Sequence, residues 1–222
     1  MNVLIFGSTG MIGQGVLREC LQDPAINNVV TVGRSSNGLN QPKLRDLVCP
    51  DLFNLKPVEA ELQGFDACFY CLGVTSSGMR EADYERLTYT LTMSIAGTLA
   101  PLNPQMTFIF VSGAGSDSTE QGSVMWARVK GKAENALMRL PFRDVYAFRI
   151  AVVLPAHGER SRTAAYRFLY SALKPLNPLI RWAFPGQVMT TEDVGRAMIQ
   201  VARNGAPKKV LESPDIKAHI PS

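Results

Sequence analysis

The stretch Val3-Leu-Ile-Phe-Gly-Ser-Thr-Gly-Met-Ile-Gly-Gln-Gly15 decides the fold of this 222-residue chain. Residues 3–6 are a short apolar run, typical of a strand that is buried on both faces of a parallel sheet. A glycine-rich loop, residues 7–13, follows at once, and apolar residues at helical spacing come after it. A strand, a glycine loop and a helix in this order predict a dinucleotide-binding unit. The alternative is a glycine-rich turn that holds no ligand.

The three glycines of this loop have separate tasks in a dinucleotide-binding unit. The first permits a tight turn, the second lets the backbone approach a pyrophosphate, and the third lets helix and strand pack closely. Free N–H groups and the positive dipole end of the helix then receive the phosphates. We therefore assign the whole loop to the cofactor: Gly7, Ser8, Thr9, Gly10, Met11, Ile12 and Gly13.

The spacing Gly-x-x-Gly-x-x-Gly, preceded by Phe6 and carrying Ser8-Thr9, resembles the short-chain dehydrogenase/reductase superfamily. It is most similar to the extended and atypical branches, which include epimerase-like and Tat-interacting-protein-like oxidoreductases. The resemblance is strong over residues 1–155 and loose afterwards. It implies a Rossmann fold, a nicotinamide dinucleotide and a C-terminal segment that covers the nicotinamide end and selects the substrate.

The rest of the chain alternates apolar strands with helices, which predicts an α/β fold with a doubly wound, mostly parallel sheet. The expected strands are 3–6, 28–32, 44–49, 65–72, 107–111 and 145–153, and the expected helices include 80–102 and 123–137. The strand order should be 3-2-1-4-5-6. Thr190 to Asp193 should cap a last helix that ends near Asn204-Gly205. We predict one domain, residues 1–222, with a core of 1–155 and a small substrate-side segment, 156–222.

Arg34 follows the second expected strand, where an NAD-preferring Rossmann domain has an acid that holds the ribose 2′-hydroxyl. A guanidinium can instead bind a 2′-phosphate through charge-assisted hydrogen bonds. Arg34 therefore predicts NADP(H) rather than NAD(H). The alternative is an arginine that leaves the sheet for solvent. A polar loop, residues 35–42, replaces a firm second helix.

The resemblance implies further cofactor residues at the ends of later strands. Asp51 and Leu52 match an adenine-contacting pair, although Asp51 could also be a turn residue that caps the next short helix. Leu72 and Gly73 match a small-residue stretch that lines the cofactor. We also assign Pro155, at the end of the sixth expected strand, to the cofactor site.

The family's catalytic set is a Tyr-x-x-x-Lys on the helix after the fifth strand and a serine near that strand's end. Lys130 stands where the lysine belongs and Ser112 is the best match for the serine, so the resemblance implies these two as catalytic residues. Because the family's lysine also holds the cofactor ribose, the resemblance implies Lys130 as a cofactor-binding residue as well. Trp126 replaces the tyrosine, and an indole cannot exchange a proton as a phenol does. A literal Tyr170-x-x-x-Lys174 lies beyond the sixth strand, outside the family position, and we interpret it as an ordinary helix pair.

These residues leave two functions open. The first is an NADP-dependent oxidoreductase that reduces a small carbonyl-type substrate, with a proton relayed through water by Lys130 and Ser112 or given by Tyr89 or Tyr170. The second is a non-catalytic NADP(H)-binding redox sensor or interaction module. Trp126 is the feature that divides them.

The composition argues against nucleic acid and a membrane as partners, so we expect a small-molecule substrate as the partner. The 23 Lys and Arg residues are spread among 19 acids, so we expect no nucleic acid, and no apolar run reaches the length of a membrane span. Two histidines predict no metal site. Four cysteines, with no recognisable signal peptide, predict a cytoplasmic location, and Cys68 and Cys71 should point to opposite faces of a strand. The oligomeric state stays open.

Overall fold

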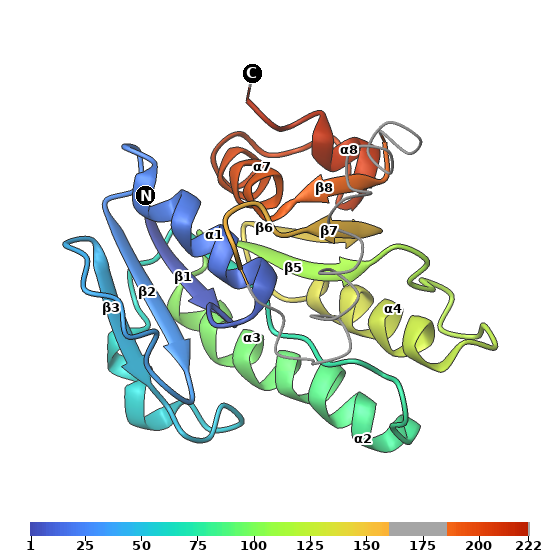
Figure 1. The fold of residues 1–222 in the computed structure, drawn as a ribbon. Helices are drawn as coiled ribbons and strands as arrows, with labels where there is room; N and C mark the ends of the chain where they lie inside the picture. The colour runs from blue at the N-terminus through green and yellow to red at the C-terminus, as the bar shows by residue number, and fades with distance from the viewer. Residues whose placement is uncertain (160–185, 222) are drawn as a thin grey trace.

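The computed structural model describes residues 1–159 and 186–221. Their centre is a seven-stranded sheet in the order β3-β2-β1-β4-β5-β6-β9, in which every neighbouring pair is parallel (Figure 1). The strands are β1 (Asn2–Phe6), β2 (Asn28–Gly33), β3 (Leu44–Val48), β4 (Ala67–Tyr70), β5 (Thr107–Gly113), β6 (Asp144–Ile150) and β9 (Val210–Glu212). The first six confirm the predicted order 3-2-1-4-5-6 and the doubly wound α/β class.

Helices cover both faces of the sheet and divide the apolar interior into two layers (Figure 1). On one face α1 (Met11–Gln22), α7 (Thr191–Asn204) and α8 (Ser213–Lys217) pack against residues such as Ile5 and Phe148. On the other face α3 (Leu91–Leu102) and α4 (Met125–Leu137) cover Tyr70, Phe108 and their neighbours. Burial on both faces explains why the strands are almost wholly apolar.

The long helix predicted over residues 80–102 is present, with a wider turn inside it. It consists of α2 (Glu81–Glu85), a π-helical turn η2 (Arg86–Thr90) and α3. A short 3₁₀ helix, η1 (Lys56–Glu61), follows β3. The cap predicted for the last helix is also confirmed, since the Thr190 side chain accepts a hydrogen bond from the Asp193 N–H and Asp193 accepts one in return.

The sixth predicted strand, 145–153, is divided in the structure. β6 ends at Ile150, and β7 (Val152–Leu154) pairs with β8 (Val188–Thr190) in a separate two-stranded sheet. The break comes at Ala151, whose N–H donates to the Ser213 side chain at 3.0 Å instead of continuing the ladder. Sequence periodicity did not show this break because Ala151 is as apolar as its neighbours.

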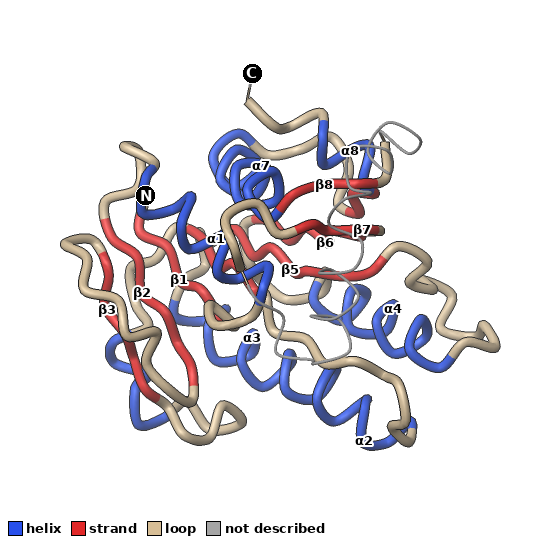
Figure 2. The backbone as a smooth tube through the Cα atoms, viewed as in Figure 1, coloured by secondary structure: helices blue, strands red, loops and turns tan. Residues whose placement is uncertain are grey.

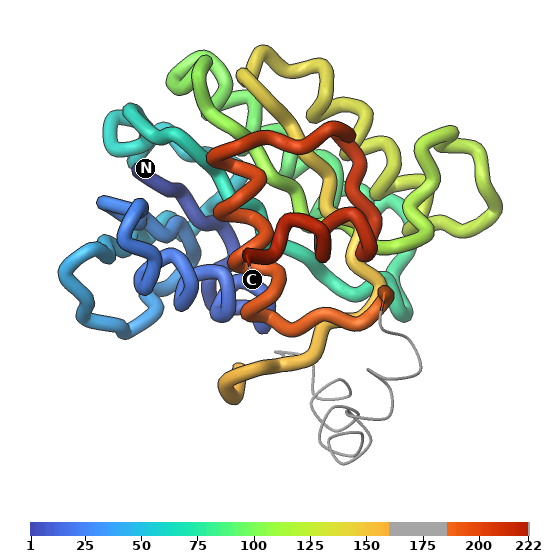
Figure 3. Tube along the Cα trace, turned by 90° about the horizontal axis from the view of Figure 1, so that it is seen from above, coloured from blue at the N-terminus to red at the C-terminus, as the bar shows by residue number. Residues whose placement is uncertain are grey.

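Part of the C-terminal segment belongs to the central sheet. β9, which the sequence did not predict, pairs with β6, and α7 lies beside α1 when the molecule is seen from above (Figure 3). Residues 160–185 lie outside the described residues. The substrate-side role of the segment 156–222 and the division of the domain at residue 155 therefore stay predictions.

The connection between β2 and β3 is a loop without a helix, as the polar residues 35–42 predict (Figure 2). In a doubly wound sheet a crossover helix would lie here, on the same face as α1. Its absence leaves the turn after β2 to be held by other contacts.

Candidate functional site

The glycine loop after β1 is shaped by close backbone approaches. Gly7 has φ +84°, and a Cβ there would lie 2.7 Å from the Cys71 carbonyl carbon. A Cβ on Gly13 would overlap the Gly7 carbonyl oxygen, whereas one on Gly10 would meet only that oxygen, at 3.3 Å. The first and third glycines are therefore required by packing, and Gly10 leaves space beside the start of α1 for a ligand.

A pocket of about 300 Å³ opens between this loop and the ends of β2, β3 and β4. Its lining combines both predicted and unpredicted residues: Gly7, Ser8, Thr9, Val32, Gly33, Arg34, Ser35, Leu52 and Leu72. Gly7, Ser8, Thr9, Arg34, Leu52 and Leu72 come from the predicted cofactor set, so the fold brings these distant residues to one cavity. Gly10, Met11, Ile12 and Gly13 continue from it into the first turn of α1.

Arg34 is one of the residues that line this pocket. Its side chain is exposed, and it makes no ion pair within residues 1–159 and 186–221. An exposed, unpaired guanidinium beside Ser35 is free to bind an anionic ligand. This placement fits the 2′-phosphate interpretation of Arg34, and equally allows the solvent-facing alternative.

The other predicted cofactor residues lie elsewhere. Asp51 is exposed, and its Oδ1 accepts a hydrogen bond from the Phe53 N–H at 3.0 Å, the turn role that was the alternative interpretation. Gly73 is exposed next to Leu72. Pro155 lines a second pocket of about 360 Å³, between the end of β7 and the start of α7, with His157 and Glu192 on its wall.

Lys130 is half-buried between α4 and β5. Its Nζ donates to the Val111 carbonyl oxygen at 3.1 Å and lies 4.6 Å from the centre of the Phe110 ring. Burial lowers the pKa of this ammonium group to about 8, although the negative charge of Glu134 opposes the shift. Lys130 is therefore a group that exchanges protons close to neutral pH.

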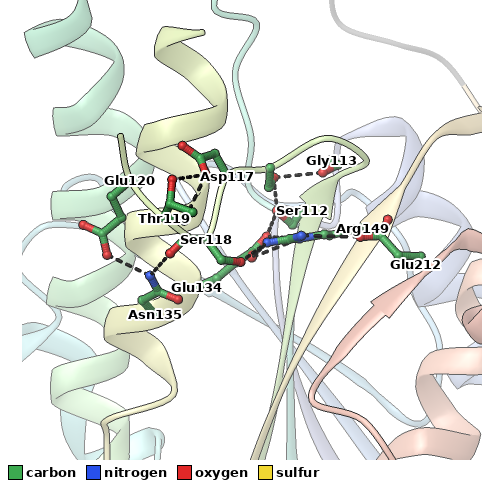
Figure 4. A network of polar contacts seen from close by, with 11 residues as sticks. Ser112, Gly113, Asp117, Ser118, Thr119, Glu120, Glu134, Asn135, Arg149 and Glu212 are labelled. Atoms are coloured by element: carbon green, nitrogen blue, oxygen red, sulfur yellow. Dashed lines mark hydrogen bonds and ion pairs between the residues drawn. The ribbon is translucent and has the colours of Figure 1, made fainter. Parts of the chain in front are cut away.

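Ser112 is buried, and its hydroxyl is hydrogen-bonded to side chains inside the protein (Figure 4). It donates to the Glu134 carboxylate and lies 3.0 Å from the Ser116 hydroxyl. Glu134 is itself paired with Arg149, with 2.6 Å between Nη2 and Oε2, and Arg149 reaches Glu212 on β9 at 3.4 Å. A substrate oxygen would have to compete with this buried carboxylate for the Ser112 proton.

Trp126 is half-buried one helical turn before Lys130. Its six-membered ring covers the end of β5, where a Cβ on Gly113 would lie 3.4 Å from Cζ3 and a Cβ on Gly115 would lie 3.7 Å from Cη2. The two glycines make room for the indole. Gly113 has no side chain and an indole has no phenol group, so these two positions supply no hydroxyl at the end of β5, where the nearest hydroxyls are those of Ser112 and Ser116.

Several remaining predictions can be placed. Cys68 packs into the α3 and α4 layer and Cys71 against the α1 layer, on opposite faces as expected, and both are free thiols. The Tyr89 ring lies 4.5 Å from the Lys132 Nζ. Tyr170 and Lys174 lie outside the described residues. In the part of the chain that the structure describes, no helix is long and apolar enough to span a membrane and no cluster of metal ligands occurs.

Sequence reasoning missed two polar networks beside the site. One joins Asp46, Asn37 and Thr31 at the turn after β2, and the other is the buried pair of Glu134 and Arg149. A usable signal existed for each. Asp46 is a charged residue within a strand that should be buried, and Glu134 lies four residues after Lys130, on the same face of the helix.

Solved structures with the same architecture include an enzyme in complex with NAD+. The Bordetella bronchiseptica enzyme WbmF, solved with NAD+, superposes with a TM-score of 0.67 over 98% of this chain and 76% of its own, at 15% identity. A short-chain dehydrogenase/reductase of Saccharomyces cerevisiae gives 0.66 over 99% of both chains, at 16% identity. The chain has the short-chain dehydrogenase/reductase fold. This bears out the fold that the glycine spacing implied, in a seven-stranded form.

The sequence relatives of this chain are mitochondrial proteins by name. The mitochondrial protein Fmp52 of Emericella nidulans is 23% identical over 206 residues, covering 89% of this chain and 85% of its own. Fmp52 of Chaetomium globosum is 27% identical over 228 residues, covering 96% and 94%. No family model matches the chain.

These names contradict the cytoplasmic location that we predicted. Four free cysteines indicate a reducing environment, but they do not identify the compartment.

Proposed function

We propose that this protein is an NADP(H)-binding oxidoreductase of the atypical short-chain dehydrogenase/reductase type that reduces a small carbonyl-type substrate. The observation that carries the proposal is the pocket of about 300 Å³ at the glycine loop, where Arg34 lies beside Ser35 and forms no ion pair with any residue that the structure describes. Its walls come from the ends of neighbouring parallel strands, the edge at which open α/β sheets bind ligands. Fold neighbours hold NAD+ in their structures, which supports the same class of cofactor here.

The residues present fit a dinucleotide. A Cβ on Gly10 would occupy the space beside the start of α1, where free N–H groups suit a pyrophosphate. The apolar side chains of Leu52 and Leu72 suit an adenine, and Arg34 suits a 2′-phosphate. The bound nicotinamide would supply the hydride, and the protein would supply orientation and a proton.

Lys130 is the side chain that we propose as the proton donor. Its pKa of about 8 leaves the ammonium mostly protonated at neutral pH while allowing it to give up a proton. Trp126 cannot take this part, and Ser112 already donates to Glu134. We therefore propose that Lys130 delivers the proton to the substrate oxygen through water.

A second candidate function is a non-catalytic NADP(H)-binding sensor or interaction module. The observation that favours it is the packing of Trp126 on Gly113 and Gly115, which fills the place of a catalytic hydroxyl. In this case cofactor binding would persist without turnover.

Cofactor choice is tested by an Arg34→Ala variant. NADPH affinity should fall by about 1.5–3 kcal/mol, the usual contribution of a hydrogen bond to a charged group, while NADH affinity hardly changes. Both dissociation constants are measured by fluorescence titration. Arg45→Ala is the control, because Arg45 is an exposed arginine of β3 that pairs with Glu61. Equal losses for the two cofactors, or a wild type that prefers NADH, would reject the NADP(H) assignment.

Turnover separates the two candidate functions. Wild type, Trp126→Tyr and Lys130→Ala are compared for NADPH consumption over a panel of aldehydes, ketones and quinones. For a reductase we expect wild-type turnover that Lys130→Ala abolishes and Trp126→Tyr increases, since a placed proton donor is typically worth about 10²–10⁴ in rate. A wild type that binds NADPH tightly and consumes none would favour the sensor.

The relatives' names also lead us to propose a mitochondrial location for this protein. Imaging of a C-terminally tagged chain against a mitochondrial marker tests it, and a diffuse signal would reject it.

A further inference from the structure

The turn after β2 carries Arg34 and Ser35, yet no helix holds it in place. Thr31 on β2 and Asp46 on β3 are register partners, on the face of the sheet that α1 covers. On its far side the turn borders a larger pocket of about 670 Å³, lined by Asn37, Leu39 and one side of α1. Open space therefore lies where a crossover helix would otherwise support the turn.

Asp46 provides the missing support through neutral donors. Its Oδ2 accepts from the Ser36 hydroxyl at 2.5 Å and from the Asn37 backbone N–H at 2.9 Å. Its Oδ1 accepts from the Thr31 hydroxyl and from the Asn37 side-chain amide. The carboxylate thus fixes both the backbone and the side chains of the turn to β3.

The charge of Asp46 is kept without a cation. Burial raises the pKa of this carboxyl, but the hydrogen bonds from Ser36, Thr31 and Asn37 outweigh burial and lower it from its ordinary value. In the described chain Asp46 forms no ion pair with Arg34 or any other basic residue. Because neutral groups satisfy the carboxylate, Arg34 stays free at the pocket.

The same network reaches the glycine loop. The Asn37 side-chain oxygen accepts a hydrogen bond from the Ser8 hydroxyl at 3.1 Å, and Ser8 lines the cofactor pocket. Asp46 therefore sets the turn after β2 relative to the loop after β1, the two segments that would meet at the adenosine ribose.

We propose that Asp46 is the positioning residue of cofactor selection: it holds Ser36 and Asn37 so that Arg34 and Ser35 face the ribose 2′-position. The inference rests on the proposed NADP(H) binding and adds the residue that makes the arginine selective. Asp46 touches no cofactor itself and acts through the turn.

The test uses the full chain with NADPH and NADH as probes, titrated by fluorescence. Asp46→Asn keeps the shape of the side chain but puts an amide in the place of one acceptor oxygen. We expect its NADPH affinity to fall about tenfold while NADH affinity changes less than about twofold, because the loss concerns the placement of one charged hydrogen-bonding group. Asn37→Ala, which keeps Asp46 and cuts the link to Ser8, should shift the ratio in the same direction.

Thr31→Val is the matched control. It removes a donor to Asp46 Oδ1 and an acceptor of the Asn37 side-chain amide, but it leaves the Ser36 hydroxyl and the Asn37 backbone N–H bound to Asp46 Oδ2, so it should lower thermal stability and change the NADPH to NADH ratio much less than Asp46→Asn does. An unchanged ratio in Asp46→Asn and Asn37→Ala, or an equal change in Thr31→Val, would overturn the inference while leaving NADP(H) binding intact. If Asp46→Asn does not fold, Asn37→Ala decides. A folded wild type that binds neither nucleotide would overturn the proposed function first, and this inference with it.

Discussion

At the scale of single residues, the three glycines of the first loop differ in what their missing side chains allow. Gly7 needs its positive φ, and Gly13 lies against the Gly7 carbonyl group. Gly10 alone has room for a side chain once the Gly7 oxygen gives by a few tenths of an ångström. A substitution can therefore separate the packing role of this loop from its ligand role.

We predict that Gly10→Val folds with nearly wild-type stability but loses dinucleotide affinity, because its side chain occupies the place of the pyrophosphate. Gly13→Ala should instead lose about 1–3 kcal/mol of unfolding free energy or more, since its Cβ would overlap backbone. Urea unfolding and NADPH titration of both variants check this. If folded Gly10→Val kept the wild-type NADPH affinity, the loop would not be part of the dinucleotide site.

Lys130 should leave a signature in the pH dependence of stability. Its pKa is about 8 in the folded protein and has an ordinary value of 10.5. Between these values the unfolded chain binds more protons than the folded one, so the contribution of Lys130 to the unfolding free energy rises with pH. Below about pH 8 the cost of burying the ammonium is fully present.

Lys130→Met should therefore flatten the rise in stability between pH 8 and 10, measured by urea unfolding at steps of half a pH unit. Lys132→Met is the control on the same helix. Its pairing with Glu85 raises the pKa of Lys132, so its stabilising contribution is lost as pH increases. Parallel curves for wild type and Lys130→Met would contradict the lowered pKa.

At the scale of elements, a buried ion pair joins α4 to β6 in addition to the apolar packing of Ala133 and Leu137. Glu134 on α4 is 1% exposed and is held by Arg149 on β6, with Ser112 on β5 as a further donor (Figure 4). Removing the cation alone would leave a buried carboxylate without a partner, which costs far more than the pair contributes. This pair also fixes the helix that carries Trp126 and Lys130.

Arg149→Met should lose about 3–5 kcal/mol of unfolding free energy for this reason. Glu212→Gln, which touches the same guanidinium from a half-exposed position, should lose only about 0–1 kcal/mol. Adding Glu134→Gln to Arg149→Met should recover part of the loss, because the uncompensated charge is gone. Similar small losses for Arg149→Met and Glu212→Gln in urea unfolding would show that Glu134 is not effectively buried.

At the scale of the whole molecule, α7 packs on α1, although about 180 residues of sequence separate the two helices (Figure 3). Two glycines let the backbones approach: Gly15 lies against Thr191, and Gly195 lies against Glu19. Glu19 is buried there and receives Arg18 and Arg196. α7 is thus joined to the same helix that would receive the cofactor phosphates.

Gly15→Ala should loosen this contact, since its Cβ would lie 2.5 Å from the Thr191 Cβ and 2.8 Å from the Thr191 carbonyl oxygen. We expect a loss of about 1–3 kcal/mol. Gly97→Ala, in the middle of α3 with no atom of another element within 4 Å of the added Cβ, should instead gain up to about 1 kcal/mol of helix propensity. Thermal unfolding of Gly15→Ala and Gly97→Ala measures the change in stability of each variant. Equal changes in the two variants would contradict the close approach of α7 to α1.

The strand order, the glycine loop at the end of β1, the placement of Arg34 after β2 and the cap of α7 could all be predicted from the sequence. Each depends on local patterns: an apolar run, a glycine required by a nearby backbone atom, or a threonine three residues before an aspartate. A parallel sheet then brings the carboxyl ends of successive strands to one edge, so residues as far apart as Ser8, Arg34 and Leu72 line one pocket.

The tertiary structure alone decided which buried polar groups pair. Ser112 donates to Glu134, Arg149 reaches Glu212 over 63 residues of sequence, and Asp46 holds the turn that carries Arg34. The packing of Trp126 on Gly113, the break at Ala151 and the addition of β9 were decided in the same way. Periodicity shows which side of an element is buried, but a buried donor takes whichever acceptor the packed chain places beside it, and that neighbour is set by the crossing of distant segments.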